Sequence, residues 1–398
     1  MKMRMLAAAV ALGAPVLAGC SPETVIRCAL TDLLASEPGP QPADTRTVAA
    51  AAETVPVADA CDAADDPAVW VNEADPEASL IVATNKVRGF VVYGLDGAVV
   101  STSDVGRVNN VDLRDGIDVG GQPTIVVAAT NRTTEAIDVL ALDPDTGGLA
   151  PLLDTPIRPD FDAEPYGLCL YRPAASGELY VFANDLDGAV EQWRLDAAAG
   201  GSGLTGTRVR SWAVGSQTEG CVADDANGWL FIGEEEVGVW RYGAGPDAST
   251  TERLAVDRVG VGEPGGGHLS ASIEGLSIYA PPDGGPDDGY LVASSQGNNT
   301  YVVYDRAPPH AYRGTFRVGG SPGASGGGTL VGGAVDGAED TDGLQVVSAP
   351  LGPRYPLGLL VVQDGINRAP DASEANQNFK LVSWGDVLDA LDLPVPAS

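Results

Sequence analysis

A short hydrophobic run, headed by a polar residue, recurs six times along the chain. The six copies begin at Asp66, Asn110, Tyr166, Glu219, Glu274 and Asp342. Successive copies are therefore separated by 44, 56, 53, 55 and 68 residues. Each run has the composition of a strand, and a repeat of this period predicts an array of similar structural units.

Each repeat continues with two further apolar runs, which are separated by turns rich in Gly or Asp. The predicted second and third strands are 80–83 with 89–93, 124–128 with 136–140, 179–182 with 189–193, 230–232 with 238–242, 290–293 with 301–304, and 358–362 with 379–382. We therefore predict an all-β fold, a six-bladed β-propeller of four-stranded antiparallel blades around a central channel. A long β-sandwich is the alternative, but it predicts no fixed order of strand types.

The two ends of the repeat region indicate how the ring of blades closes. Residues 54–58 are expected to add a strand to the last blade, beside residues 379–383. The stretch 321–340 is rich in Gly and is expected to form a mobile loop. Short helical segments are predicted at 29–35 and 387–393, and 36–45 has the composition of a linker.

The first twenty residues differ from the repeats. Lys2 and Arg4 precede an apolar stretch, and the sequence LAGC ends at Cys20. This pattern resembles the lipobox of a bacterial lipoprotein signal peptide, which implies cleavage before Cys20 and attachment of lipid to its sulfur. An ordinary secretory signal is the alternative, and the apolar run is too short to span a membrane.

The predicted domains are accordingly a signal peptide at 1–19, a lipid-attachment site and linker at 20–50, and the propeller domain at 51–393. We expect an exported protein, a periplasmic or cell-surface lipoprotein anchored to the outer membrane through Cys20.

The chain is strongly acidic, with 55 Asp and Glu residues against 23 Lys and Arg residues and a formal net charge of −32. Such a charge disfavours nucleic acid as a partner, because phosphate backbones bind basic surfaces. A large excess of carboxylates can instead hold hard cations such as calcium, although it also serves solubility alone.

Export would place the four remaining cysteines, Cys28, Cys61, Cys169 and Cys221, in an oxidising compartment. Cys169 and Cys221 occupy nearly equivalent positions in adjacent repeats, so a bridge between them would join neighbouring inner strands. A bridge between Cys28 and Cys61 would then fasten the N-terminal segment to the propeller. Buried free thiols are the alternative.

The innermost strands of a propeller converge on its axis, so that matching positions of successive repeats lie close together in space. The acidic group predicted at one channel mouth consists of Asp65, Asp66, Asp112, Glu164, Glu219, Glu274, Asp340 and Asp342, with Glu234, Glu235 and Glu236 nearby. Such a concentration of like charge is costly unless a cation neutralises it, and calcium binds several oxygen ligands at once. We predict a calcium site here. Scattered, solvated turn carboxylates are the alternative.

Several other phosphatase and metal chemistries are excluded. The chain has only two histidines, His268 and His310, which excludes a zinc site of three histidines. We expect both to be surface or structural residues. The chain lacks the Arg-His-Gly motif of histidine phosphatases and the His-Cys motif of cysteine phosphatases. The segment 143–147 (DPDTG) matches an aspartyl-phosphatase pattern, but its place between two predicted strands favours a hairpin turn.

Nine segments, distributed over about residues 54 to 390, together resemble β-propeller phytases. They are 65–70 (DDPAVW), 84–86 (TNK), 106–112 (GRVNNVD), 216–220 (SQTEG), 273–276 (IEGL), 293–298 (ASSQGN), 340–343 (DTDG), 363–365 (QDG) and 376–380 (NQNFK). They occur in the order found in that family.

The resemblance implies a calcium-dependent enzyme that removes phosphate from phytate, which is myo-inositol hexakisphosphate, by direct attack of calcium-activated water. We expect a monomer. Lys86, Arg132 and Tyr166 match the family's phosphate-binding positions, and together with Glu219 they form the implied catalytic set. Arg88 is a further candidate for phosphate binding. The positions that match those near the family's several calcium ions are Asp66, Glu219, Glu235, Glu274, Gln296 and Asp342.

The sequence departs from the family pattern at four positions. Leu186 and Val87 stand where a basic residue is common, and Ser272 stands where an acidic residue is common. Gly267 stands where the family commonly has Arg before His-Leu. Two other functions are therefore kept as alternatives. One is a six-bladed lactonase or esterase, and the other is a calcium-stabilised binding lipoprotein without catalytic activity.

Overall fold

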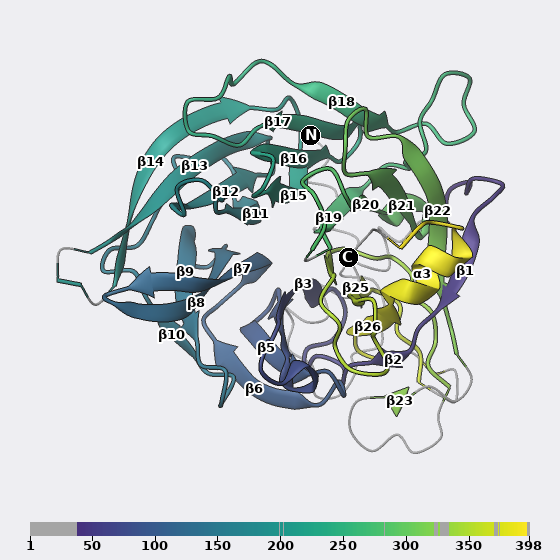
Figure 1. The fold of residues 1–398 in the computed structure, drawn as a ribbon, viewed down its shortest axis with the longest axis horizontal. Coiled ribbons are helices and arrows are strands. Elements are labelled where there is room, and N and C mark those ends of the chain that lie inside the picture. Colours follow the sequence, from purple (N-terminus) through teal and green to yellow (C-terminus); the bar gives the residue numbers. More distant parts are fainter. Residues whose placement is uncertain are drawn as a thin grey trace, which may run out of the picture.

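The computed structural model describes residues 38–395, apart from 199, 202, 282, 322–324, 327–333, 370–372 and 374. Over this range the chain forms six sheets arranged around a central axis, and most of each sheet is antiparallel (Figure 1). The predicted six-bladed β-propeller is therefore confirmed. Among the described residues, no helix has the length and apolar character needed to cross a membrane.

The first three blades follow one another along the chain. The first contains β3 (Ala64–Trp70), η1 (Pro76–Ala78), β4 (Leu80–Asn85), β5 (Gly89–Gly94) and β6 (Val99–Asp104). The second contains β7 (Val108–Val119), β8 (Gln122–Asn131), β9 (Ala136–Leu142) and β10 (Leu149–Pro151). The third contains β11 (Pro165–Tyr171), β12 (Leu179–Asp185), β13 (Ala189–Ala197) and β14 (Leu204–Ala213).

The remaining blades include strands from both ends of the chain. The fourth contains β15 (Thr218–Asp224), β16 (Trp229–Glu234), β17 (Gly238–Gly243) and β18 (Leu254–Arg258). The fifth contains β19 (Ile273–Tyr279), β20 (Tyr290–Ser295), η2 (Gln296–Asn298), β21 (Thr300–Asp305), β22 (Tyr312–Gly319) and β1 (Arg46–Ala49). The sixth contains β24 (Leu344–Val347), β25 (Leu359–Asp364), β26 (Asn378–Ser383), β2 (Ala52–Glu53) and β23 (Ser325–Gly326), and α3 (Trp384–Ala390) follows β26.

Each of the six predicted runs forms an innermost strand, and close packing explains the glycine that often follows its first residue. A Cβ on Gly167 would lie 1.8 Å from the carbonyl oxygen of Glu219 in the next blade. A Cβ on Gly220 would lie 1.6 Å from the carbonyl oxygen of Glu274. A residue with a Cβ does not fit at Gly167 or Gly220, because the neighbouring inner strands approach too closely there. The repeated glycine is therefore a consequence of the inner strands meeting at the axis.

The ring closes as predicted, but two residues earlier in the chain. In β2, Ala52 lies opposite Leu381 and Glu53 lies opposite Lys380 of β26. The predicted strand at 54–58 is interrupted because the amide of Val55 donates to the carbonyl of Gly97 in the first blade. Regular strand pairing therefore ends at Glu53, although the amides of Thr54 and Val57 still donate to the carbonyls of Phe379 and Gln377.

The N-terminal part of the described chain adds a strand that the repeat did not predict. Strand β1 lies parallel to β22 at the outer edge of the fifth blade (Figure 1). Val48 of this strand is buried in the core. Residues 46–49 are thus part of a sheet, whereas the sequence predicted linker as far as residue 50.

The C-terminal helix begins at Trp384, three residues before the predicted start at residue 387. The reason is packing, because Trp384 is fully buried and stacks on Tyr279 with ring centroids 5.0 Å apart. The predicted helical turns at 29–35, Cys20, Cys28 and half of the loop at 321–340 lie outside the described residues. The segment 143–147 forms the predicted turn between β9 and β10.

Cys169 and Cys221 form a disulfide bond, which joins the inner strands β11 and β15 of neighbouring blades. This pairing was one of the predicted alternatives. Cys61 is also disulfide-bonded. The predicted pairing of Cys61 with Cys28 remains a prediction, because Cys28 lies outside the described residues.

Loss of the Cys169–Cys221 bridge is expected to lower stability while leaving the fold intact. The bond closes a loop of 52 residues, and such a constraint on the unfolded chain stabilises the folded state by about 3–4 kcal/mol. Urea denaturation of the double variant Cys169→Ala/Cys221→Ala should show this loss against wild-type protein. An unchanged midpoint would contradict the prediction.

A cavity of about 320 Å³ runs between the inner strands. Its walls include Asp66, Asn110, Asp112, Cys221 and Gln345. Side chains on one inner strand bind the backbone of the next, because Asp66 accepts from the Val111 amide and Asp112 accepts from the Leu170 amide. The polar lining therefore also holds neighbouring blades together.

Candidate active site

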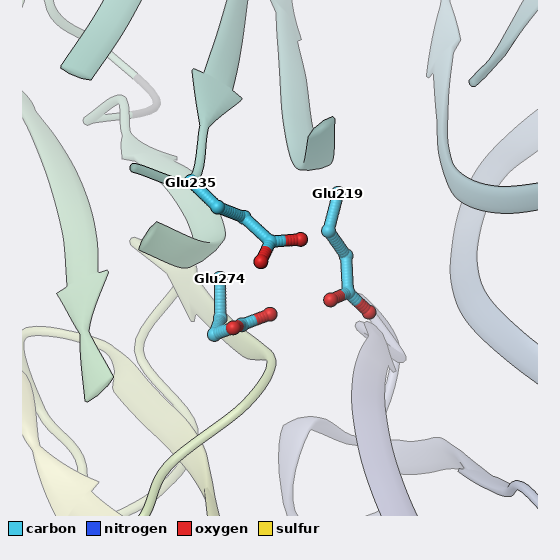
Figure 2. A group of neighbouring side chains, drawn as sticks. All are labelled: Glu219, Glu235 and Glu274. Carbon is cyan, nitrogen blue, oxygen red and sulfur yellow. The ribbon is translucent and has the colours of Figure 1, made fainter. Parts of the chain in front are cut away.

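Three glutamates from two neighbouring blades lie close together, with their carboxylates near one another (Figure 2). Glu219 lies in β15, Glu235 follows β16 and Glu274 lies in β19. One carboxylate oxygen from each lies within 4.8 Å of the others, and all three side chains are buried. We call these three residues the glutamate cluster.

Burial and mutual repulsion raise the pKa values of this cluster. Burial, followed by the charge of Glu219, raises the pKa of Glu235 to about 8. The same two causes raise the pKa of Glu274 well above its usual range. Without a cation, the cluster therefore retains protons near neutral pH. A buried group of carboxylates with no basic partner among them has the oxygen donors that calcium prefers, so the residues fit this ion.

A second group of carboxylates surrounds Lys86, which follows β4 in the first blade. Its Nζ lies 2.6 Å from Asp62 Oδ1, 3.3 Å from Asp65 Oδ1 and 2.7 Å from Asp342 Oδ2. Burial lowers the pKa of Lys86, but these carboxylates outweigh burial and raise it well above the usual value. Lys86 is therefore a permanently charged ammonium group. We call these four residues the lysine cluster.

The glutamate and lysine clusters are electrostatically connected. Burial raises the pKa of Asp65 to about 6, with Lys86 opposing this effect and Glu219 adding to it. Burial also raises the pKa of Asp342 well above its usual value, and the charge of Glu219 adds to this effect. Gln296 orients Asp342 by donating to its Oδ1 at 2.6 Å. The two clusters thus form one acidic centre that spans several blades.

Arg132 and Tyr166 contribute a different kind of group to this centre. The guanidinium of Arg132 lies 5.9 Å from the centre of the Tyr166 ring. Within the described part of the chain, no carboxylate lies within ion-pairing distance of Arg132, and its buried Nε has no hydrogen-bond partner. Burial, Glu219 and Glu274 raise the pKa of Tyr166 well above its usual range, so that its phenol stays protonated. An unpaired guanidinium beside a neutral hydroxyl can bind an anion such as phosphate.

The structure brings together most of the predicted site residues. These are Asp65, Lys86, Arg132, Tyr166, Glu219, Glu235, Glu274, Gln296 and Asp342. Asp340 lies close enough for Lys86 to influence its pKa, which burial raises. Asp66 is buried next to Asp65 and lines the cavity, and its Oδ2 accepts from the Val111 amide at 3.0 Å.

Three predicted ligands do not join this centre, so the predicted single acidic ring is wrong for them. Asp112 lies two residues further along its strand than the repeated first position and is paired with Arg114. Glu164 is half-exposed and paired with Arg107. Glu234 faces its own sheet, where Ser216 and Trp240 donate to it.

Arg88, Leu186 and Ser272 were also singled out from the sequence, and none of them contributes a charge directly to the acidic centre. Arg88 is more than half exposed and forms an ion pair with Asp59, so it would have to leave this partner to contact a phosphate. Leu186 lies in the turn between β12 and β13, which corresponds to the turns that carry Lys86 and Arg132 in the first two blades. It supplies no charge there. Ser272 has φ = 61° and accepts a hydrogen bond from the Gln296 amide through its carbonyl oxygen.

The sequence reasoning missed two members of the centre. Asp62 forms the shortest ion pair of Lys86, but it lies outside the repeated positions. Asn109 donates to Glu219 Oε1 at 2.6 Å and precedes the repeated position in the second blade. Its place in the GRVNNVD segment was the one available signal.

Both histidines are structural, as predicted. His268 stacks on Tyr312 and pairs with Asp257. His310 is buried, and its Nε2 lies 2.9 Å from Arg241 Nη1. Neither contacts the glutamate or lysine cluster.

Two solved structures show only weak similarity to the chain. The β-propeller domain of Cps50 (Swd1) from Myceliophteria thermophila matches with a TM-score of 0.41 and 9% identity, over 79% of this chain and 82% of that chain. BBS1N in complex with ARL6DN, soaked with mercury, matches with a TM-score of 0.39 and 11% identity, over 76% of this chain and 74% of that chain. These scores are too low to bear on fold or function.

The sequence comparisons are much more specific. The 3-phytase of Bacillus subtilis (strain 168) is 41% identical over 349 residues, which cover 86% of this chain and 85% of that protein. The family model for phytase matches residues 23–395. This match covers the six repeats and the whole acidic centre. The chain therefore belongs to the phytase family.

Proposed function

We propose that this protein is a calcium-dependent phytase, which hydrolyses phosphate monoesters of phytate to lower inositol phosphates and free phosphate. The observation that carries the proposal is the position of Arg132 and Tyr166 beside the buried glutamate cluster. Arg132 and Tyr166, which can bind phosphate, thus lie next to the glutamate cluster, which fits calcium. Similarity to a 3-phytase supports phytate as the substrate.

Glu219, Glu235 and Glu274 would hold calcium, with Asp65 and Asp342 close to them. Bound calcium would neutralise these carboxylates and supply an activated water for direct attack on phosphorus. Without this neutralisation, the acidic centre would repel a polyanionic substrate. A protein with a formal net charge of −32 would not attract phytate without bound cations.

The chain's own residues have separate parts in this proposal. Arg132 would bind non-bridging phosphate oxygens through its guanidinium and stabilise the charge that develops there. Tyr166 would donate a hydrogen bond from its protonated phenol. Lys86 would hold Asp65 and Asp342 in place and present a fixed positive charge to the phosphate. Gln296 would orient Asp342.

The direct test is phosphate release from phytate by purified protein, with calcium and with excess chelator. We expect release only with calcium. Full activity in chelator would contradict the calcium requirement. Cleavage of a lactone without phosphate release would favour the lactonase alternative.

Calcium affinity is expected to rise with pH. Burial raises the pKa of Asp65 to about 6 and that of Glu235 to about 8, so calcium must displace protons as it binds. Calorimetry in buffers of different ionisation enthalpy should detect protons released at pH 7. Binding without proton release would contradict this prediction.

The stability of the calcium-free protein is expected to fall as the pH rises. Because these folded-state pKa values are raised, the folded protein binds more protons than the unfolded chain, and this stabilisation is lost as the pH rises through about 6 and about 8. The calcium-free protein should therefore melt at a lower temperature at pH 8 than at pH 6. Saturating calcium should reverse this difference.

We also propose that the protein is an exported, monomeric lipoprotein anchored to the outer membrane through Cys20. The LAGC sequence after a basic start and an apolar stretch supports this localisation. Intact-mass analysis of the membrane fraction, with Cys20→Ala as the control, tests it. An unmodified N-terminus in a soluble fraction would contradict it.

A further inference from the structure

The N-terminal segment before the first blade passes directly over the turn that carries Gln296. Residues 39–41 form hydrogen bonds with the turn at η2. The chain then runs along the outer edge of the fifth blade as β1 (Figure 1). We call residues 39–49 the N-terminal strap. It is not part of the repeats, and the sequence predicted a linker over most of this stretch.

Three hydrogen bonds fix the strap to η2. The Gly39 amide donates to the Gly297 carbonyl at 2.7 Å, and Gln41 Nε2 donates to the Asn298 carbonyl at 2.8 Å. In return, Asn298 Nδ2 donates to the Pro40 carbonyl at 3.0 Å. Asn298 is completely buried, so these contacts form a packed junction.

The turn beneath the strap has an unusual backbone. Asn299 has φ = 55°, and Ser272 and Asp340, which bond to the turn, have φ values of 61° and 50°. Left-handed conformations of non-glycine residues are unfavourable and persist where surrounding contacts enforce them. The strap supplies such contacts from one side of the turn.

The same turn holds two acidic residues of the site. Gln296 Nε2 donates to Asp342 Oδ1 at 2.6 Å, and Asn299 Oδ1 accepts from the Asp340 amide at 2.8 Å. Asp342 in turn pairs with Lys86 at 2.7 Å. A continuous chain of contacts therefore connects residues 39–41 with the lysine cluster.

The strap is held firmly at its other end. Residues 46–49 pair in register with residues 316–319 of β22, and Val48 is buried in the core of the fifth blade. The amide of Ala50 then donates to Gly319. Because β1 is anchored, residues 39–41 act from a rigid support and not from a loose tail.

We propose that the N-terminal strap is a positioning element of the active site, with Gln41 and Asn298 as its positioning residues. By fixing η2, the strap sets the position of Gln296 and thereby the orientation of Asp342 toward Lys86. Neither positioning residue touches substrate in this proposal. The kinetic consequence rests on the proposed phytase activity, whereas the structural consequence does not.

Hydrogen–deuterium exchange of the full-length protein tests the structural consequence. We expect Gln41→Ala to speed amide exchange in 296–299 and 340–342 by roughly fivefold, because one hydrogen bond at the junction is lost. Gln41→Glu keeps the shape but loses the donor, so it should behave like Gln41→Ala. Gln41→Lys keeps a donor and should restore slow exchange. Asn298→Ala should have a larger effect than Gln41→Ala.

Thr47→Ala is the matched control, because it removes a strap contact far from the turn. Thr47 is exposed in β1, and its hydroxyl accepts from Arg317 at 3.0 Å. This variant should leave exchange in 296–299 and 340–342 unchanged. Equal effects of Thr47→Ala and Gln41→Ala, or no effect of Gln41→Ala and Asn298→Ala, would overturn the proposal.

Kinetics with phytate and calcium test the second consequence. We expect Gln41→Ala to lower kcat by about threefold to tenfold with little change in melting temperature, because misplacement of an active-site group acts on the chemical step. Gln41→Lys should recover most of this loss. Unchanged kcat despite faster exchange would overturn the link to the site. Absence of phosphate release by the wild-type protein would refute the proposed function, and the exchange experiment would still decide the role of the strap.

Discussion

The variant Glu219→Gln is expected to lower kcat for phytate by about 100-fold or more and to weaken calcium binding by about 10- to 100-fold. Glu219 is the residue on which the acidic centre depends most. Its charge raises the pKa values of Glu235, Glu274, Asp65 and Asp342. Glutamine keeps an oxygen that can accept from Asn109, so the change removes charge with little change in shape.

Calorimetry of calcium binding is the primary measurement for this variant, followed by phosphate release at saturating calcium. Fewer protons should be released than from wild-type protein, because Glu235 and Glu274 lose a repelling neighbour. Glu234→Gln is the matched control, since Glu234 is equally a buried glutamate but bonds to Ser216 and Trp240. It should leave calcium affinity within about twofold of wild type. Equal weakening by both variants would contradict the assignment of the cluster.

Arg132→Ala is expected to lower kcat/KM for phytate by about 100- to 1000-fold while leaving calcium affinity unchanged. Arg132 has no carboxylate partner within the described chain, so its charge is available to a phosphate. Arg132→Lys should recover only part of the loss, because an ammonium group cannot reproduce the two parallel hydrogen bonds of a guanidinium. Stability should change little, because the contact with Tyr166 is a weak cation–π interaction of about 0.5–1 kcal/mol.

Steady-state kinetics and calcium calorimetry on the same preparation separate this result from that of Glu219→Gln. Arg313→Ala is a suitable control, because Arg313 is half-exposed and pairs with Asp305 at the outer side of the fifth blade. It should have wild-type kinetics. A normal kcat/KM for Arg132→Ala would contradict the assignment of Arg132 as the phosphate-binding group.

The sequence by itself determined the number of blades and their inner strands. The inner strands approach one another so closely that a side chain at Gly220 or Gly167 would collide with the neighbouring backbone. The same close approach occurs in several blades, so glycine recurs at the same position of the repeat in the sequence. The second and third strands of each blade could also be predicted from the sequence, because buried central strands require continuous apolar runs.

Only the tertiary structure decided which acidic residues meet. Glu234 and Glu235 are adjacent and chemically identical, yet Glu234 bonds within its own blade whereas Glu235 joins the glutamate cluster. Glu234 is the last residue of β16, whereas Glu235 begins the turn that follows, so a difference of one position changes the environment of the side chain. Asp112 had the right residue type, but Arg114 and the Leu170 amide hold it within the channel.

The tertiary structure also decided the contributions from outside the repeats. Asp62 and β1 have no counterpart in the other blades, so no periodic pattern could place them. Their positions follow from the path of a single segment, which runs past η2, along the fifth blade and into the sixth before reaching Lys86. Local sequence fixes what repeats around the axis, because every blade meets the same packing demand. Contacts made once, between distant parts of the chain, depend on the closed ring that brings those parts together.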